Sequence, residues 1–173
     1  MKNLLIVVDM QNDFITGTLA NTEGQKIVKK IVDFIREFDG DIIATRDTHA
    51  ENYLETQEGR NLPVVHCIKG TDGWNIVPEI QEALNESGNL LAIVDKATFG
   101  DVGLGELVGR KLYDTVTLCG VCTDICVISN ALVIKACALE TVVKVRKDLC
   151  AGVTPESHEI ALKAMQACQV EVI

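Results

Sequence analysis

The sequence predicts an α/β fold, a three-layer αβα sandwich around a six-stranded parallel sheet. Hydrophobic residues make up 47% of the chain and aromatic residues only 4%, so aliphatic side chains must fill the core, as they do around buried parallel strands. Short β-branched runs alternate with segments of helical spacing, and repeated β-α-β units form a parallel sheet covered on both faces. The 173 residues match one domain of about 100–200 residues, so we expect a single domain over residues 1–173.

Six short apolar runs are rich in β-branched residues and have the length of strands. They are Leu4–Val8, Asp41–Thr45, Leu90–Val94, Thr115–Cys119, Thr141–Val145 and Gln169–Ile173. Because helical segments separate them, we expect these strands to run parallel to one another.

Five segments between the strands have the spacing of amphipathic helices. They are Gly24–Phe38, Pro78–Glu86, Gly103–Leu112, Asp124–Ala138 and Pro155–Ala167. Pro78 suits the first turn of a helix, and Thr154 before Pro155 is typical of a helix start. The stretch Asp47–Val77 has no pattern, and we interpret this long loop as functional.

Charge and cysteine content narrow the class of protein. The formal net charge is −9, with no basic run to offset it, so we expect neither nucleic acid nor a membrane surface as a partner. The apolar run before Asp9 is too short for an export signal or a membrane span, and we expect a cytoplasmic protein. The seven cysteines are odd in number and are interpreted as free thiols.

Reactive side chains follow four of the predicted strands. In chain order they are Asp9 after the first strand, Asp47 and His49 after the second, Asp95 and Lys96 after the third, and the segment Gly120–Cys126 after the fourth. Ligands of parallel sheets bind beyond the carboxyl ends of the strands. Strands often end in polar residues, but the convergence of four segments on one edge favours an active site there.

Cys126 is the candidate nucleophile. It lies in the first turn of a predicted helix opened by Thr123 and Asp124, where free N–H groups and the helix dipole favour a thiolate, and a nearby Lys96 would lower the thiol pKa further. The alternative is a small buried side chain with no chemistry. No histidine is near Cys126 in sequence, so Asp9 is the candidate to take the thiol proton and later protonate a leaving amine.

Three further features stay outside this chemistry. Cys119-x-x-Cys122 has the spacing of a redox pair, but Cys119 still belongs to a predicted strand, whereas the attacking cysteine of such motifs begins a helix. His158 is interpreted as a polar residue near the start of the last helix. Trp74, beside Gly73, is either a wall of the site or a loop anchor packed on the core.

Three motifs together, IVVDMQNDF, VDKATFG and GVCTDICV, resemble those of the isochorismatase-like cysteine hydrolases, and the resemblance extends over essentially the whole chain. It implies a catalytic triad of Asp9, Lys96 and Cys126. It also implies a non-proline cis peptide bond between Val121 and Cys122, and an oxyanion hole formed by the amides of Cys122 and Cys126.

The middle segment, RDTHAENYLETQEGRNLPVVHCIKGTDGW, resembles the nicotinamidase and pyrazinamidase branch of that family. The resemblance implies a divalent metal bound by Asp47, His49 and His66, with Glu58 as a fourth ligand if the loop is shifted by one residue. A carboxylate with two imidazoles suits zinc, and iron and manganese are alternatives. Without a metal, this would be a loop with one surface histidine and one half-buried histidine.

The resemblance also implies a substrate and a reaction. The metal would orient a pyridine nitrogen while the carboxamide faces Cys126, and Phe14, Leu19 and Phe99 would form apolar walls around the ring. The expected function is a metal-assisted cysteine amidohydrolase that converts nicotinamide to nicotinate and ammonia through a thioester on Cys126.

Two other functions stay open at this point. The first is a metal-free amidase for a small carbamoyl or ureido substrate, because a fold and a triad do not determine the pocket. The second is a binding module without catalysis, against which the presence of Asp9, Lys96 and Cys126 together argues. The resemblance further implies a homo-oligomer.

Overall fold

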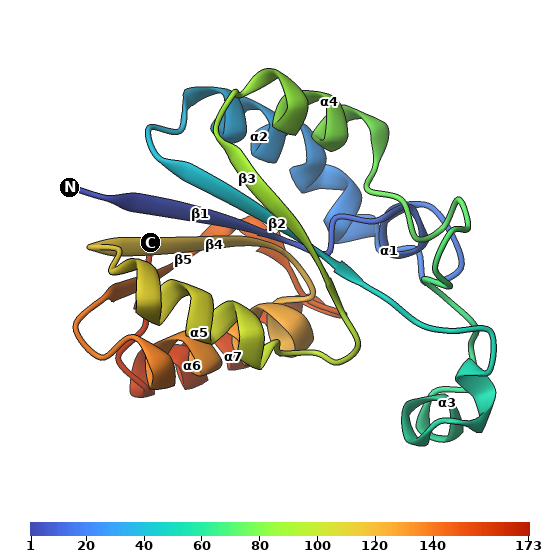
Figure 1. Ribbon diagram of the computed structural model, residues 1–173. Coiled ribbons are helices and arrows are strands. Elements are labelled where there is room, and N and C mark those ends of the chain that lie inside the picture. Colours follow the sequence, from blue (N-terminus) through green and yellow to red (C-terminus); the bar gives the residue numbers. More distant parts are fainter.

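The computed structural model describes residues 1–173 and contains one six-stranded sheet in the order β3-β2-β1-β4-β5-β6 (Figure 1). Its strands are β1 (Asn3–Val8), β2 (Asp41–Asp47), β3 (Leu90–Lys96), β4 (Thr115–Val121), β5 (Val142–Ala151) and β6 (Glu171–Val172). Every pairing between neighbouring strands is parallel. The predicted α/β fold with a six-stranded parallel sheet is therefore confirmed.

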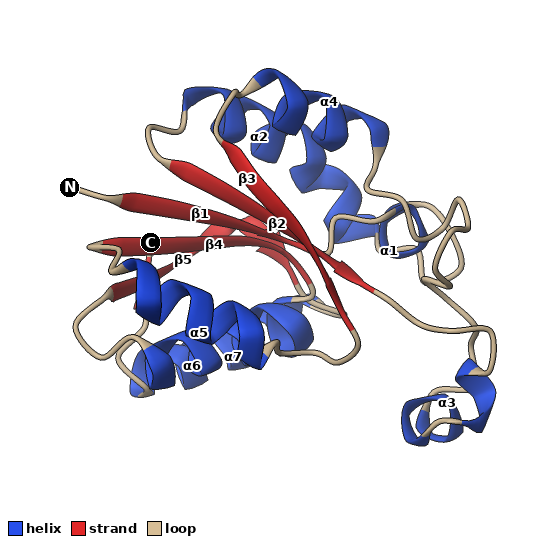
Figure 2. Ribbon diagram, in the orientation of Figure 1, coloured by secondary structure: helices blue, strands red, loops and turns tan.

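Helices cover both faces of the sheet. They are α1 (Asn12–Ile15), α2 (Thr22–Glu37), α3 (Gln57–Asn61), α4 (Pro78–Glu86), α5 (Val102–Lys111), α6 (Ile128–Cys137) and α7 (Pro155–Ala167), with a 3-10 turn η1 (Tyr53–Glu55) and a π-helical turn η2 (Thr123–Val127). Figure 2 shows α2 and α4 on one face and α5, α6 and α7 on the other. The three layers match the predicted sandwich. None of the helices combines the length and apolarity needed to cross a bilayer.

Several strand ends differ from the prediction. The strands β2, β3 and β4 run two residues further, to Asp47, Lys96 and Val121, because pairing with the neighbouring strand continues after the apolar run has ended. Pairing of β5 with β4 resumes beyond an irregularity and carries β5 to Ala151. The last strand is shorter than predicted and pairs only through its two residues.

Two predicted segments have a different local structure. The helix predicted from Asp124 begins as the π-helical turn η2, and regular α-helix starts only at Ile128. The stretch Asp47–Val77 contains η1 and α3, which the sequence pattern did not indicate. Both elements are too short to show helical periodicity.

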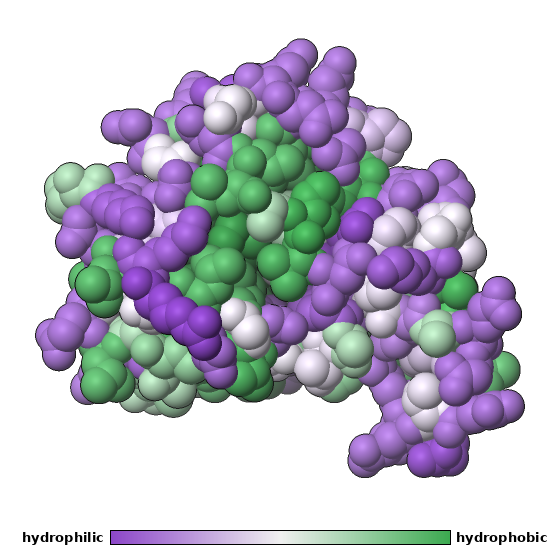
Figure 3. All heavy atoms as spheres, viewed as in Figure 1, coloured by the Kyte–Doolittle hydropathy of each residue, from purple (hydrophilic) through white to green (hydrophobic).

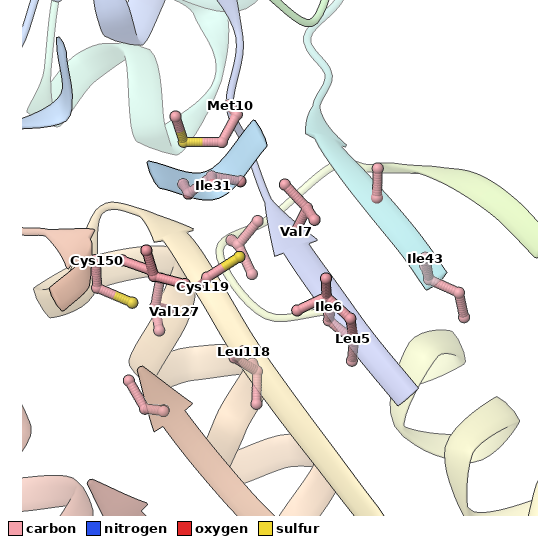
Figure 4. Packing of buried hydrophobic residues seen from close by; sticks show 14 of the residues in the cluster. Leu5, Ile6, Val7, Met10, Ile31, Ile43, Leu118, Cys119, Val127 and Cys150 are labelled. Atoms are coloured by element: carbon pink, nitrogen blue, oxygen red, sulfur yellow. The ribbon is translucent and has the colours of Figure 1, made fainter. Parts of the chain in front are cut away.

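Aliphatic side chains of the central strands form the core, as predicted. Leu5, Ile6 and Val7 of β1 are almost completely buried, and Figure 4 shows them packed beside Leu118 of β4. Met10 is equally buried directly after β1. This packing holds the carboxyl ends of β1 and β4 in place, which is where the reactive residues follow.

One edge of the sheet carries an exposed apolar surface. Figure 3 shows an apolar patch framed by polar residues, on the face where β3 forms the outer edge of the sheet. Leu91 of β3 is 44% exposed. A patch of this kind is common at protein interfaces. The homo-oligomer implied by the resemblance stays a prediction.

Candidate active site

The parallel sheet brings the predicted reactive residues to one edge, except Asp95, whose carboxylate pairs with the Arg46 guanidinium at 2.7 Å and lies outside the cluster. Asp9 directly follows β1, and Asp47 and Lys96 are the last residues of β2 and β3. Cys126 lies on η2, beyond the short connection that follows β4. Asp9 and Lys96 are completely buried, and Cys126 is 5% exposed. The carboxyl ends of four strands thus supply one buried cluster, as the topology predicts.

Lys96 lies between Asp9 and Cys126. Its ammonium nitrogen Nζ is 2.6 Å from Asp9 Oδ2 and 3.5 Å from the Cys126 sulfur. It also donates to the Thr98 carbonyl at 3.2 Å. The three residues implied by the resemblance to be a triad are therefore in contact, with the cation joining the carboxylate to the thiol.

Asp9 is held by its backbone and by Thr45. Its φ of 50° is in the left-handed region, which few residues other than glycine adopt, and such conformations are concentrated at functional sites. The Thr45 hydroxyl donates to Asp9 Oδ1 at 2.6 Å. The other oxygen, Oδ2, is buried and has no hydrogen-bond donor apart from its ion pair with Lys96. That oxygen can accept a proton.

Burial determines the protonation states of this cluster. It raises the pKa of Asp9, although the Lys96 charge opposes the rise. Burial also raises the pKa of the Cys126 thiol well above its usual value, and the Asp9 carboxylate adds to this more than Lys96 subtracts. Burial would lower the pKa of Lys96, but Asp9 and Cys126 outweigh it and the ammonium stays charged. The predicted low pKa of Cys126 is therefore wrong, because desolvation and Asp9 prevail over Lys96.

The turn that carries Cys126 has the predicted backbone. The Val121–Cys122 peptide bond is cis, which confirms the expectation. The preceding Gly120 has a φ of 116°, and a Cβ there would collide with the Val8 carbonyl oxygen, so no other residue fits where β4 passes β1. The Cys122 carbonyl accepts the Val127 amide at 3.0 Å, which closes the π-helical turn.

Thr123 and His158 attach this turn to α7. The buried Thr123 hydroxyl and the His158 ring nitrogen Nδ1 are 2.7 Å apart. His158 therefore packs behind the turn and forms no hydrogen bond with the other two histidines, which agrees with its interpretation as a polar residue near the start of the last helix.

Four potential ligands converge beside the triad. Asp47 Oδ2 is 2.9 Å from His49 Nε2 and 3.5 Å from His66 Nε2. Glu58 Oε1 is 3.6 Å from His49 Nε2 and 4.0 Å from His66 Nε2. A tetrahedral zinc site with bonds of about 2.1 Å has ligand separations of about 3.4 Å. The four residues thus have the spacing and the donor atoms of such a site.

The hydrogen bonds and charges of these four residues also fit a cation. His66 Nδ1 donates to the Val64 carbonyl at 2.7 Å, which directs Nε2 towards the other ligands. Asp47 Oδ1 is buried without a hydrogen-bond partner. Burial would raise the pKa of Asp47, but hydrogen bonds with His49 and His66 hold it well below its usual range. Burial and the Asp47 carboxylate raise the pKa of Glu58, although His49 and His66 oppose the rise.

Gln11 and Asp13 support the site and were not predicted. The buried Gln11 amide accepts the Asp47 N–H at 2.7 Å and donates to the Asp47 carbonyl at 2.8 Å. Asp13 Oδ2 accepts the Cys67 amide at 2.7 Å, directly after His66. Both residues lie in the motif IVVDMQNDF, which marked this segment without indicating the contacts.

Trp74 is a loop anchor. Its indole N–H donates to the Thr48 hydroxyl at 2.8 Å, and the Arg46 guanidinium lies 3.6 Å from the centre of its ring. Its carbonyl accepts a hydrogen bond from the Gln11 side chain at 2.9 Å. Of the two interpretations of Trp74, a wall of the site or a loop anchor, these contacts support the loop anchor. Trp74 is not part of the cavity wall.

One cavity of about 570 Å³ is lined by Cys126 and by three of the four potential metal ligands. Its lining includes Cys122, Cys126, Asp47, Glu58 and His66, together with the predicted apolar walls Phe14, Leu19 and Phe99. The Phe14 ring lies 5.6 Å from the His66 ring. Lys96 and Asp9 are completely buried beneath the cavity, so Cys126 is the member of the cluster that a small molecule would meet. Pockets of this size bind small organic ligands.

The sequence is similar to known proteins over nearly its whole length. The isochorismatase domain matches residues 3–173. The nicotinamidase/pyrazinamidase of Mycobacterium tuberculosis (strain ATCC 25618 / H37Rv) is 30% identical over 182 residues, which covers 98% of this chain and 97% of that protein.

Solved structures show the same likeness. The crystal structure of the pyrazinamidase of Pyrococcus horikoshii in complex with zinc superposes with a TM-score of 0.79 at 30% identity, covering 100% of this chain and 99% of that chain. The pyrazinamidase/nicotinamidase of Streptococcus mutans UA159 superposes with a TM-score of 0.86 at 26% identity, covering 99% and 100%.

Proposed function

The chain belongs to the isochorismatase family, in its nicotinamidase and pyrazinamidase branch, and from this we propose that it hydrolyses nicotinamide to nicotinate and ammonia. The observation that carries the proposal is the position of Cys126. It contacts a buried Lys96–Asp9 ion pair and opens into the cavity that Asp47, Glu58 and His66 also line. A nucleophile and a set of potential metal ligands thus face the same cavity.

In the proposed reaction, the Cys126 thiol loses its proton as its sulfur attacks the amide carbon. The proton passes to Asp9, whose oxygen Oδ2 has no partner other than the Lys96 ammonium and whose pKa is raised by burial. Lys96 stays charged and stabilises the thiolate as it forms. A resting thiol with a high pKa therefore becomes a nucleophile only when Asp9 accepts its proton.

The tetrahedral intermediate carries its negative charge on the former carbonyl oxygen. We assign the backbone amides of Cys122 and Cys126 to bind this oxygen. When the C–N bond breaks, Asp9 returns the proton to the leaving nitrogen, ammonia departs and a thioester on Cys126 remains. Water then attacks the thioester while Asp9 accepts one of its protons. The C–S bond breaks to release the acid, and Asp9 returns that proton to the sulfur, which restores the thiol.

We assign Asp47, His49, Glu58 and His66 to hold a divalent cation, with zinc favoured by the carboxylate and imidazole donors and with iron or manganese as alternatives. When bound, such a cation supplies a Lewis acid that can bind a ring nitrogen. Phe14, Leu19 and Phe99 then enclose the planar ring and exclude water from it. The side chain of Gln11 holds the Asp47 backbone in place.

The experiment that tests this proposal measures ammonia release from nicotinamide, with pyrazinamide in parallel, by zinc-loaded wild type and Cys126→Ala. We expect rapid release by the wild type and none by Cys126→Ala. Cys122→Ala is the matched control, because it keeps the nucleophile and the Cys122 backbone amide and changes only a neighbouring side chain of the cavity wall, and it should retain measurable release.

Two outcomes would contradict the proposal. Full activity of Cys126→Ala would remove the cysteine from the mechanism. No release by the zinc-loaded wild type would exclude nicotinamide and move the substrate to small carbamoyl or ureido compounds, which the same assay can test.

A further inference from the structure

Asn130 is a completely buried polar residue that the proposed mechanism does not use. It lies on α6, four residues after Cys126. Its side-chain amide donates to the Cys126 carbonyl at 2.8 Å and to the Phe99 carbonyl at 3.0 Å, and its oxygen accepts the Asp101 amide at 3.0 Å. Both N–H groups and the oxygen are therefore engaged, and the three bonds join two separate chain segments.

The segment that Asn130 holds carries one wall of the cavity. Residues 97–101 connect β3 to α5 without regular structure, and residues 97–99 are exposed. Phe99 is 42% exposed yet lines the cavity, so burial does little to fix its position. The bonds from Asn130 to the Phe99 carbonyl and the Asp101 amide lie on either side of Gly100 and restrain the segment instead.

We propose that Asn130 is a positioning residue that sets the location of the Phe99 wall relative to the nucleophile, and that it thereby determines the preference for ring-bearing amides. The inference rests on the proposed function for its substrate. A ring bound between fixed walls loses affinity when one wall can move, because the contacts are then formed at an entropic cost. An acyclic amide has no ring to contact Phe99 and depends on the wall far less.

Ser129 offers a matched control on the same turn. Its hydroxyl donates to the Ile125 carbonyl at 2.6 Å, which is the same kind of bond to a residue four positions earlier that Asn130 makes to Cys126. Unlike Asn130, it has no hydrogen bond to residues 97–101. Ser129→Ala therefore perturbs the turn without releasing the Phe99 segment.

The informative variant is Asn130→Thr. A threonine hydroxyl can still donate to the carbonyl four residues earlier, but its side chain is too short to reach Phe99. We expect the KM for nicotinamide to rise about tenfold, as for the loss of about 1.4 kcal/mol, with kcat changed much less. The kcat/KM for acetamide, a ring-free amide, should change little, so the preference for the ring-bearing amide falls. Ser129→Ala should leave the KM for nicotinamide unchanged.

A double-mutant cycle with Phe99→Ala separates this role from a general loss of stability. If Asn130 acts through Phe99, the two substitutions are non-additive, and Asn130→Thr raises KM little further once the ring of Phe99 is absent. Fully additive effects on KM, or a KM for nicotinamide that Asn130→Thr leaves unchanged, would overturn the proposal. Asn130→Ala extends the series if it folds, but the test does not depend on it.

Hydrogen exchange distinguishes failure of this inference from failure of the proposed function. If the wild type does not hydrolyse nicotinamide, the proposed function fails, and the exchange rates of the amides at residues 98–101 still test the restraint. We expect faster exchange in Asn130→Thr than in Ser129→Ala. Equal exchange in the two variants would overturn the positioning role whatever the substrate.

Discussion

The Lys96 ammonium lies 2.6 Å from Asp9 Oδ2 and joins it in a completely buried ion pair. The same nitrogen is 3.7 Å from Asp47 Oδ1, which has no hydrogen-bond partner. One cation therefore stabilises a carboxylate of the reactive cluster and a carboxylate among the four potential metal ligands. The two parts of the site are electrostatically linked through this residue.

Replacing Lys96 by methionine should reduce stability as well as activity. Lys96→Met leaves the Asp9 carboxylate buried without its counter-charge, and removing one partner of a buried pair costs about 3–5 kcal/mol. We expect this loss in the free energy of unfolding from urea titration, together with loss of ammonia release. Lys96→Met combined with Asp9→Asn should recover part of the stability and none of the activity. If the double variant were no more stable than Lys96→Met, the unpaired Asp9 carboxylate would not be the cause of the lost stability.

Thr45→Val should move the acid limb of the pH–activity profile to higher pH. Burial raises the pKa of Asp9, and the Thr45 hydroxyl opposes the rise by donating to the carboxylate. Only the carboxylate accepts the thiol proton, so activity is lost as the pH falls through this pKa. Without the hydroxyl the pKa rises further, and the profile of kcat/KM should show an earlier loss on acidification.

The control for that shift is Thr117→Val, which alters another buried threonine in the middle of β4. Its acid limb should coincide with that of the wild type. An acid limb that Thr45→Val leaves in place, or moves to lower pH, would remove Asp9 as the group that titrates.

Gly120→Ala should disrupt the turn that carries the nucleophile. A Cβ at Gly120 would collide with the Val8 carbonyl oxygen, and its φ of 116° is in any case unfavourable for alanine. Gly88→Ala is the matched control, because Gly88 also has a positive φ, of 69°, but an added Cβ there meets no atom within 4 Å. We expect a larger fall in Tm and in nicotinamide turnover for Gly120→Ala. Equal effects would mean that φ alone, and not the contact with β1, requires glycine.

The fold and the position of the reactive residues could be predicted because their signals are local. Each strand is a short apolar run, and parallel order then places the residues after each run at one edge. Asp9 and Lys96 could thus be assigned to one site although they are distant in sequence. The cis peptide bond before Cys122 could be expected only from the resemblance to the family, because no physical pattern in the residues indicates it.

The protonation state of Cys126 could not be predicted, because it depends on burial that only the folded chain creates. The helix terminus and Lys96 were visible in the sequence, but the desolvation that outweighs them was not. The contacts of Gln11 and Asn130 were also hidden, since each bonds to backbone groups of a distant segment. Side chain to backbone contacts of this kind leave no periodic signal.

Metal removal should abolish activity reversibly. Dialysis against a chelator should stop ammonia release from nicotinamide, and added zinc should restore it, because Asp47, His49, Glu58 and His66 have the donors and spacing of a zinc site. His49→Ala should lower the zinc content per chain, measured by elemental analysis. His158→Asn alters the third histidine of the chain and should keep the zinc content of the wild type. Activity indifferent to prolonged chelation would exclude the metal from the mechanism.

Gln11→Leu should weaken metal binding without removing any ligand. The Gln11 side chain bonds to both the N–H and the carbonyl of Asp47, so leucine leaves these two buried groups unpaired and the Asp47 carboxylate less restrained. Loss of a residue that orients a ligand lowers metal affinity about 10–100-fold. Zinc competition with a chromophoric chelator measures this directly, apart from turnover. At saturating zinc, Gln11→Leu should regain most of its activity, whereas His49→Ala should not. An affinity equal to that of the wild type would show that the ligand loop holds Asp47 without Gln11.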